Sequence, residues 1–451
     1  MPELSPTRWI KLVLKSLGPG VITGAADDDP SGIATYSVAG AQLGTKLLWT
    51  ALITWPLMAA VQVMCARIGM VTGRGLAGNF KLRFPGWLLG AFVLALLAAN
   101  TINIGADLAG MADAAEMLSG INSRIYVVAF AIAISWATVE LRYEQIAGVL
   151  KLLVLVLFAY PITAFVVGVD WFQVLRDTLI PSIPRTRDEW STLVAILGTT
   201  ISPYLFFWQA SEEVEEEKAA GLTTIASRKG ATPEELQLRR VDVNVGAFFS
   251  NLVMFFIILT TAMTLHRHGM TDIQTTRQAA EALRPLAGNL AATLFTVGIV
   301  GVGFLAIPTL AGSAAYACAD TLRWRQGLDK KVKQARSFYA VILLSTGIGV
   351  GLNFAGINPV KALYWTAVIN GLLAPFLMVA ILMVAADKKM MQGQPSSRAG
   401  WVLVAIATVA MFAAGGAMFI ASPSSPPAKS SVAPTTQDIG IGRADSVRLA
   451  F

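Results

Sequence analysis

The stretch "GAADDDPSGIATYS", residues 24–37, places three aspartates and a proline inside the first long apolar segment of the chain. A carboxylate near the middle of a bilayer is costly unless it meets water, a partner or a cation, so it indicates function. On a continuous helix, neighbouring side chains point about 100° apart, and one of Asp27, Asp28 and Asp29 would face lipid. Pro30 has no N–H and disfavours helical backbone at the residue before it. We therefore expect the helix to unwind over residues 28–32, where carbonyls and a carboxylate would line a cavity that suits a hard divalent cation.

The composition identifies an all-α polytopic membrane protein. Of 451 residues, 55% are hydrophobic and 14% are charged, against roughly 25% charged residues in soluble domains. Apolar runs of about 18 residues or more recur along the chain. The two cysteines, Cys65 and Cys318, show no pairing pattern and are expected to be buried thiols. The net charge of +7 is attributed to cytoplasmic loops and not to nucleic-acid binding, and we expect no cofactor.

The apolar runs predict eleven membrane spans, the first broken at Asp29–Pro30 and the sixth at Ser202–Pro203. The predicted spans are 17–45, 47–70, 86–118, 125–141, 143–168, 190–224, 243–265, 287–318, 337–353, 362–386 and 400–421.

The distribution of basic residues predicts the orientation. With the N-terminus inside, the cytoplasmic segments hold 22 Lys and Arg residues and the outer loops hold nine. Because cytoplasmic loops carry an excess of basic residues, residues 1–16 are expected in the cytoplasm. An odd number of spans then places the C-terminus outside. We expect a multi-pass protein of a bacterial cytoplasmic (inner) membrane.

The segments between and after the spans have their own signals. Residues 169–189 are predicted as an external loop, and about 225–242 as a cytoplasmic loop. Within the latter, Thr232 and Glu235 have the spacing of a helix capping box. The tail at 422–451 is rich in Pro, Ser and Thr and is predicted to be disordered.

The sixth span, "ILGTTISPYLFFWQASEE" at 196–213, contains a second proline, Pro203, in mid-span. Thr199, Thr200 and Ser202 come just before it. Discontinuous helices at corresponding positions of two halves indicate an inverted-repeat transporter with its site at the midplane. We therefore predict a 5+5 arrangement, with repeats at 17–168 and 190–386 and one additional span at 400–421.

Further polar residues lie in the third and tenth spans. In "NTINIGADLAGMADAAE", residues 100–116, Asn103 and Asp107 are one turn apart and share a helix face. They are interpreted as part of a polar pathway to the site, with an interhelical hydrogen bond as the alternative. Asn370, beside Gly371 in the tenth span, is either an ion ligand or a helix-packing amide.

Three motifs resemble the NRAMP family of divalent metal transporters. They are "GPGVITGAADDDPSGIATY" at 18–36, "ADLAG" at 106–110 and "TTISPY" at 199–204, and the resemblance extends over about residues 15–390. It implies a LeuT-type fold and uptake of a divalent metal ion into the cytoplasm.

The resemblance also implies roles for individual residues. The metal-binding aspartate of the family falls on Asp29. Independently of the resemblance, Asp27 and Asp28 are expected to add negative potential and to contact metal-bound water. The implied correspondences are Ala26 and Thr199 for the two carbonyl donors, Gly32 for the asparagine ligand, Ser202 for the methionine ligand, Tyr204 for the histidine, and Gly110 for the third-span glutamate, with the nearby aspartate kept as Asp107.

The departures from the family pattern concern ion choice and coupling. Methionine is a soft ligand that favours transition metals, whereas Ser202 offers a hard oxygen. A wider, oxygen-lined site suits partly hydrated Mg²⁺ or Mn²⁺, because Mg²⁺ gives up its water reluctantly. The His and Glu of the family are both absent, which indicates transport without proton coupling. The chain therefore resembles the NRAMP-related magnesium transporters.

Several alternatives remain open from the sequence. The first is a proton-coupled Mn²⁺/Fe²⁺ importer of the standard NRAMP type. The second is an amino-acid carrier of the same fold, which three consecutive aspartates disfavour because they repel a substrate carboxylate. An intramembrane aspartyl protease would pair Asp29 with Asp107, and a scaffolding role would leave the buried carboxylates unexplained.

Overall fold

The computed structural model describes residues 19–141 and 155–423, and within these ranges its regular structure is helical. Among these described residues, eight helical segments are long and apolar enough to cross a membrane. The predicted N-terminal segment 1–16 lies outside the described residues, and so do nearly all of the predicted tail and part of the predicted span 143–168.

The α-helices follow one another along the chain from α2 to α19. They are α2 (Pro19–Asp27), α3 (Pro30–Leu43), α4 (Trp49–Thr72), α5 (Leu76–Arg83), α6 (Gly86–Ser119), α7 (Ser123–Glu140), α9 (Ala159–Val166), α10 (Trp171–Leu179), α11 (Arg187–Thr200), α12 (Pro203–Ala219), α13 (Pro233–Thr264), α14 (Thr276–Ala280), α15 (Arg284–Ala287), α16 (Ala291–Leu322), α17 (Arg336–Asn353), α18 (Pro359–Ala386) and α19 (Arg398–Ile420). Short 3₁₀ helices are η1 (Leu155–Phe158), η2 (His266–His268), η3 (Glu281–Leu283), η4 (Gly288–Leu290) and η5 (Val332–Gln334).

Ten of the predicted spans coincide with described helices, with differences at the ends. Of the fifth predicted span, 143–168, the structure describes only η1 and α9, so this span stays a prediction. The first predicted span is divided into α2 and α3, and the sixth into α11 and α12. The seventh begins at Pro233 and not at 243, so the second half of the predicted cytoplasmic loop is helical. It starts there because Thr232 and Glu235 form the predicted capping box. The predicted external loop 169–189 contains α10, which Asp170 caps.

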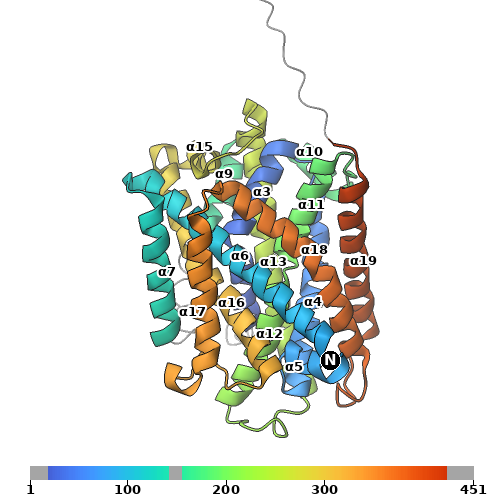
Figure 1. The fold of residues 1–451 in the computed structure, drawn as a ribbon. Helices are drawn as coiled ribbons and strands as arrows, with labels where there is room; N and C mark the ends of the chain where they lie inside the picture. The colour runs from blue at the N-terminus through green and yellow to red at the C-terminus, as the bar shows by residue number, and fades with distance from the viewer. Residues whose placement is uncertain (1–18, 142–154, 424–451) are drawn as a thin grey trace, which may run out of the picture.

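The two ends of the described chain lie at opposite ends of the helix bundle. At the start of α2, the Gly20 amide donates to Asp242 near the start of α13 (2.8 Å). After α19, the Arg187 amide donates to the carbonyl of Ser422 (3.0 Å). Figure 1 shows α10 and α15 at the end where α19 stops, and the α12–α13 loop at the other end. Such an arrangement requires an odd number of crossings.

Helix α13 lies against both halves of the first broken helix. A Cβ added at Gly24 would lie 2.5 Å from the Gly246 carbonyl, and one added at Gly40 would lie 2.3 Å from the Ile258 carbonyl. These backbone contacts leave no space for a side chain. Helices α7, α17 and α19 lie at the periphery (Figure 1) and expose apolar side chains such as Ile132, as expected of a lipid-facing surface.

Candidate functional site

The first break is shorter than the sequence predicted. Helix α2 ends at Asp27 and α3 begins at Pro30, so only residues 28 and 29 are non-helical, not 28–32. Asp29 is the N-cap of α3, with extended backbone (φ −68°, ψ 170°). Its Oδ1 accepts hydrogen bonds from the Gly32 amide and the Ser31 hydroxyl, both at 2.7 Å. An N-cap carboxylate followed by proline at the first helical position restarts a helix at once, which explains the short break.

The second break lies at residues 201–202, as predicted. Helix α11 ends at Thr200 and α12 begins at Pro203. Ser202 has extended backbone (φ −81°, ψ 134°), and its hydroxyl donates to the carbonyls of Gly198 and Thr199, both at 2.7 Å. The Ser202 side chain therefore satisfies the last turn of its own preceding helix.

Each proline frees one specific carbonyl. In an α-helix the amide of residue i donates to the carbonyl of residue i−4, and proline has no amide hydrogen. Pro30 thus leaves the carbonyl of Ala26 without its helical donor, and Pro203 does the same for Thr199. The Ala26 carbonyl instead accepts from the Tyr204 hydroxyl at 2.9 Å. The family resemblance implied Ala26 and Thr199 as the two carbonyl donors. The positions of Pro30 and Pro203, four residues later in each case, select the same two residues from the sequence alone.

The two breaks face one another. A Cβ built on Gly32 would lie 3.1 Å from the Thr199 hydroxyl oxygen, which has no hydrogen-bond partner among the described residues. The Tyr36 hydroxyl of α3 lies 3.2 Å from the Thr200 hydroxyl of α11. The Tyr204 hydroxyl likewise connects α12 to α2. Helix α3 therefore contacts α11, and α2 contacts α12. The sequence predicted only the carbonyl of Thr199 as a metal ligand, so its hydroxyl oxygen is an additional candidate ligand.

Helix α6 brings a third element to the first break. The Asn103 amide donates to Asp29 Oδ2 at 3.0 Å. Asp107 lies one turn further along α6, near the Asp29 carboxylate and the backbone of Ser31. Neither carboxylate oxygen of Asp107 meets the distance and angle limits of a hydrogen bond within the described residues, and the side chain is fully buried. Asn103 and Asp107 therefore lie at the predicted site.

The other two aspartates contact α13. Asp27 Oδ2 accepts from the Ser250 hydroxyl at 2.5 Å, and Asp28 Oδ1 lies 3.3 Å from the same hydroxyl. Both side chains are buried, with exposed fractions of 0% and 2%. The contacts of Asp28 are thus with α13, whereas those of Asp29 are with α3 and α6.

Asn370 lies on α18 beside the second broken helix. Its neighbour Gly371 packs against the backbone of α11, where an added Cβ would lie 2.3 Å from the Val194 carbonyl. The Asn370 amide oxygen is buried and has no hydrogen-bond partner among the described residues. Both interpretations of Asn370, as ion ligand and as packing amide, stay open.

The donor set at the breaks is made of oxygen atoms. It comprises one carboxylate (Asp29), the carbonyls of Ala26 and Thr199, and the Thr199 hydroxyl. Nowhere in residues 19–141 and 155–423 do three His, Cys, Asp or Glu side chains gather in a metal-holding group. Asp29 and Ala26 are buried, with exposed fractions of 1% and 0%. The two breaks therefore bring buried oxygen ligands and one capping carboxylate to the same part of the structure.

Comparison with known proteins identifies the family. The model of the Nramp family (natural resistance-associated macrophage protein-like) matches residues 20–421. The chain belongs to this family. A divalent metal cation transporter MntH of Caldanaerobacter subterraneus subsp. tengcongensis is 26% identical in an alignment of 417 residues that covers 88% of this chain and 91% of the relative. The MntH of Yersinia enterocolitica is 29% identical in an alignment of 320 residues that covers 68% of this chain and 73% of the relative. The resemblance stated from the motifs is confirmed.

Solved structures share the fold of this Nramp-family chain. The manganese transporter of Eremococcus coleocola has a TM-score of 0.71 at 18% identity, with 94% of this chain and 91% of that chain covered. MhsT, solved with L-phenylalanine, has a TM-score of 0.54 at 14% identity, with 88% and 98% covered. The predicted LeuT-type fold class is thus confirmed.

Proposed function

We propose that this chain transports divalent metal ions across a membrane by alternating access, with the ion held between the two helix breaks. The observation that carries the proposal is that the two helix breaks face one another, with the Asp29 carboxylate and the Thr199 hydroxyl both beside Gly32. The Ala26 and Thr199 carbonyls have lost their helical donors and accept from the hydroxyls of Tyr204 and Ser202 instead. Half-helix ends with free carbonyls are suited to cation binding in discontinuous transporter helices. MntH relatives that match most of this chain are named divalent metal cation transporters, which supports the proposal.

The donor set favours Mg²⁺ or Mn²⁺ as a partly hydrated ion. All available groups are hard oxygens, and Gly32 and Ser202 supply no soft ligand. Since Ser202 donates to its own helix, the protein offers few direct ligands, and water would complete the coordination shell. This composition suits Mg²⁺, which keeps several waters. Manganese is supported by the Eremococcus coleocola relative, which is named a manganese transporter.

Transport without proton coupling is the favoured mode. Tyr204 and Gly110 occupy the positions of the His and Glu that the family resemblance associates with coupling. One observation favours the alternative of a proton-coupled Mn²⁺/Fe²⁺ importer. The buried Asp107 carboxylate lies near Asp29 and forms no ion pair within the described residues, which makes it a candidate proton carrier.

An amino-acid carrier of the same fold is the third candidate. MhsT, which shares the fold, was solved with L-phenylalanine. The first helix break of this chain adjoins three consecutive aspartates, which oppose the binding of a substrate carboxylate. We therefore place this function below both metal-transport alternatives.

The direction of transport rests on the predicted orientation. With 22 basic residues in the predicted cytoplasmic segments and nine outside, the N-terminus is inside. The proposed moving units are the repeats 17–168 and 190–386, and the broken helices form the contacts between them. The proposed location is a bacterial cytoplasmic membrane, with metal ions carried inward.

Flux through proteoliposomes tests the proposal. The purified chain is reconstituted, and entry of Mg²⁺, Mn²⁺ and Cd²⁺ is followed with and without a pH gradient, together with lumenal pH. We expect Mg²⁺ and Mn²⁺ entry that leaves lumenal pH unchanged. Acidification coupled to Mn²⁺ entry would select the proton-coupled alternative. Uptake of radiolabelled amino acids with no metal flux would refute metal transport altogether.

A further inference from the structure

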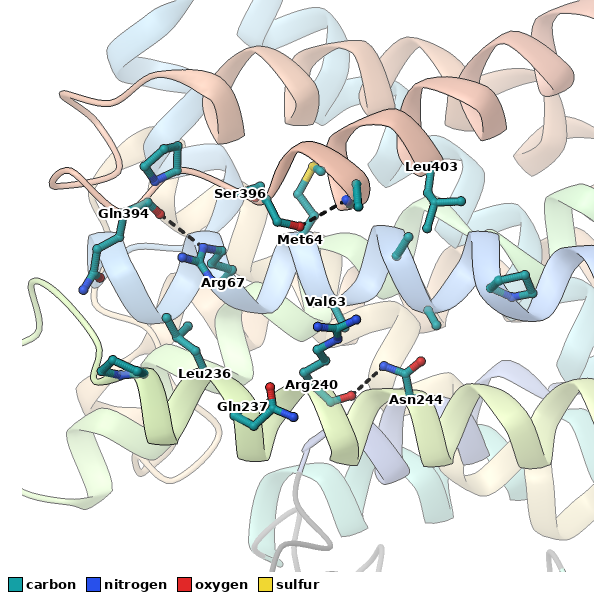
Figure 2. A pocket seen from close by; sticks show the side chains of 18 of the residues that line it. Val63, Met64, Arg67, Leu236, Gln237, Arg240, Asn244, Gln394, Ser396 and Leu403 are labelled. Carbon is teal, nitrogen blue, oxygen red and sulfur yellow. Dashed lines mark hydrogen bonds between the residues drawn. The ribbon is translucent and has the colours of Figure 1, made fainter. Parts of the chain in front are cut away.

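A groove lies between α4, α13 and the segment that leads into α19, and its lining includes no residue of the broken helices α2, α3, α11 and α12. It encloses about 650 Å³. Arg67 of α4 and Arg240 of α13 line it together with Gln394 of the connecting segment (Figure 2). A neighbouring cavity of about 560 Å³ shares Arg240 and continues along Phe248. The two cavities thus meet at the Arg240 side chain.

The groove is positively charged. Arg67 is held in place because its Nε donates to the Gln394 carbonyl at 3.1 Å. Neither Arg67 nor Arg240 forms an ion pair within the described residues, and the lining includes no Asp or Glu. The adjacent Arg239 behaves differently, since it forms ion pairs with three acidic side chains. Two guanidinium groups therefore face this groove without a neutralising partner in the described chain.

The polarity of the groove changes along its length. On α4 the lining runs from Arg67 through Val63 and Ala60 to Pro56, and on α13 it runs from Pro233 past Arg240 and Asn244 to Phe248. At 1.5 Å per residue the stretches from Arg67 to Pro56 and from Arg240 to Phe248 span about 17 Å and 12 Å. Half of a bilayer's hydrocarbon core is about 15 Å thick. The charged end lies toward the predicted cytoplasmic ends of both helices, and the apolar end extends toward the middle of the bilayer.

We propose that this groove binds one anionic phospholipid of the cytoplasmic leaflet. Its phosphate-bearing headgroup would lie between Arg67 and Arg240, and an acyl chain would follow Ala60 and Pro56. Guanidinium groups recognise phosphate through paired N–H donors. Basic pockets between membrane helices on the cytoplasmic side are suited to anionic headgroups. The leaflet follows from the proposed orientation, whereas the binding itself does not depend on metal transport.

Charge and polarity disfavour other occupants. The N-terminal segment 1–18 carries Arg8, Lys11 and Lys15 against a single acidic residue, Glu3. A positively charged segment would be repelled by the two arginines. A free phosphate ion would leave the apolar half of the groove without a partner.

Lipid titration of the full chain tests the proposal. Native mass spectrometry of the protein in detergent measures binding of phosphatidylglycerol and of phosphatidylcholine with identical acyl chains. We expect phosphatidylglycerol to bind more tightly. The double variant Arg67→Gln/Arg240→Gln should weaken its binding about 30-fold, which corresponds to about 1 kcal/mol for each arginine. Ala60→Trp, which fills the apolar end, should weaken both lipids.

A matched control distinguishes a specific lipid-binding site from a general effect of surface charge. Lys388→Gln/Lys389→Gln removes the same charge from the same predicted side, but neither lysine lines the groove. This control should bind phosphatidylglycerol as the wild type does. Equal binding of both lipids, equal loss in the lysine control, or unchanged binding in the arginine variant would overturn the proposal. If inorganic phosphate competed with phosphatidylglycerol and Ala60→Trp did not change this competition, the groove would be a phosphate-ion site. That result would also overturn the proposal.

Discussion

Replacing Asp29 with Asn separates the charge at the candidate site from its role in folding. Asp29 caps α3 through the Gly32 amide (2.7 Å), and an asparagine oxygen can accept the same bond because Asn and Asp are equally good N-caps. The new amide group would face the Asn103 amide, which now donates to Asp29 Oδ2. The Asn103 oxygen has no partner in the described chain, so a flip of its amide restores a hydrogen bond. We expect unfolding free energy to change by less than about 1 kcal/mol.

The effect of Asp29→Asn on the ion should be much larger. Loss of a residue that only hydrogen-bonds to a metal ligand commonly costs about 10–100-fold in metal affinity. Asp29 is the carboxylate proposed to contact the ion directly, so its neutralisation should weaken binding by at least about 100-fold, or about 2.7 kcal/mol. Isothermal titration with Mn²⁺ and Mg²⁺ measures this loss, and thermal unfolding checks the fold.

A matched control for Asp29→Asn lies on α6. Asp113 accepts a hydrogen bond from the Thr276 hydroxyl at 2.6 Å, and Asn at this position keeps the acceptor while removing one charge. Asp113→Asn should retain wild-type affinity. If folded Asp29→Asn protein bound Mn²⁺ within tenfold of the wild type, the ion would not be held by this carboxylate, and the site assignment would be wrong.

Two further predictions concern ion selectivity and the freed carbonyls. Gly32→Asn combined with Ser202→Met should raise the affinity for Cd²⁺ relative to Mg²⁺ by at least about tenfold, because the soft sulfur prefers Cd²⁺. Competition titration measures this ratio of affinities. An unchanged ratio would contradict the proposed basis of selectivity. Tyr204→Phe removes the hydroxyl that donates to the Ala26 carbonyl. It should cost the ion-free protein about 1–3 kcal/mol, the penalty of an unpaired buried carbonyl. Added Mn²⁺ should restore part of the loss in thermal unfolding, whereas an equal loss with and without Mn²⁺ would show that the ion does not bind this carbonyl.

Local chemistry determined what the sequence could predict about the breaks. The positions of both breaks follow from proline, whose missing amide acts within one helical turn. The grouping of Asn103 with Asp107 follows from helical spacing alone. The length of the first break was overestimated, because Ser31 and Gly32 are poor helix formers but an N-cap carboxylate before Pro30 outweighs their propensity.

Contacts between distant segments could not be predicted in the same way. Nothing in the local sequence shows that the Tyr204 hydroxyl reaches Ala26, 178 residues away in the chain. The direction of the Ser202 hydroxyl was equally hidden, because it depends on the backbone path that α11 takes at its end. The groove at Arg67 and Arg240 also arises from packing of α4 against α13, which no spacing rule indicates.

The arrangement of donors suggests how movement and ion release are connected. Of the proposed ligands, Asp29 and Ala26 come from the first repeat and Thr199 from the second, so the site exists only while the two breaks face one another. At the predicted cytoplasmic end, the Gly20 amide is bound to Asp242, which also pairs with Arg239. A displacement of α2 away from α12 and α13 would break the Tyr204–Ala26 and Gly20–Asp242 hydrogen bonds together. Opening toward the cytoplasm would therefore remove the Ala26 carbonyl from the ion while Asp29, anchored on α3, stays in place, and the ion would lose ligands on the side from which it leaves.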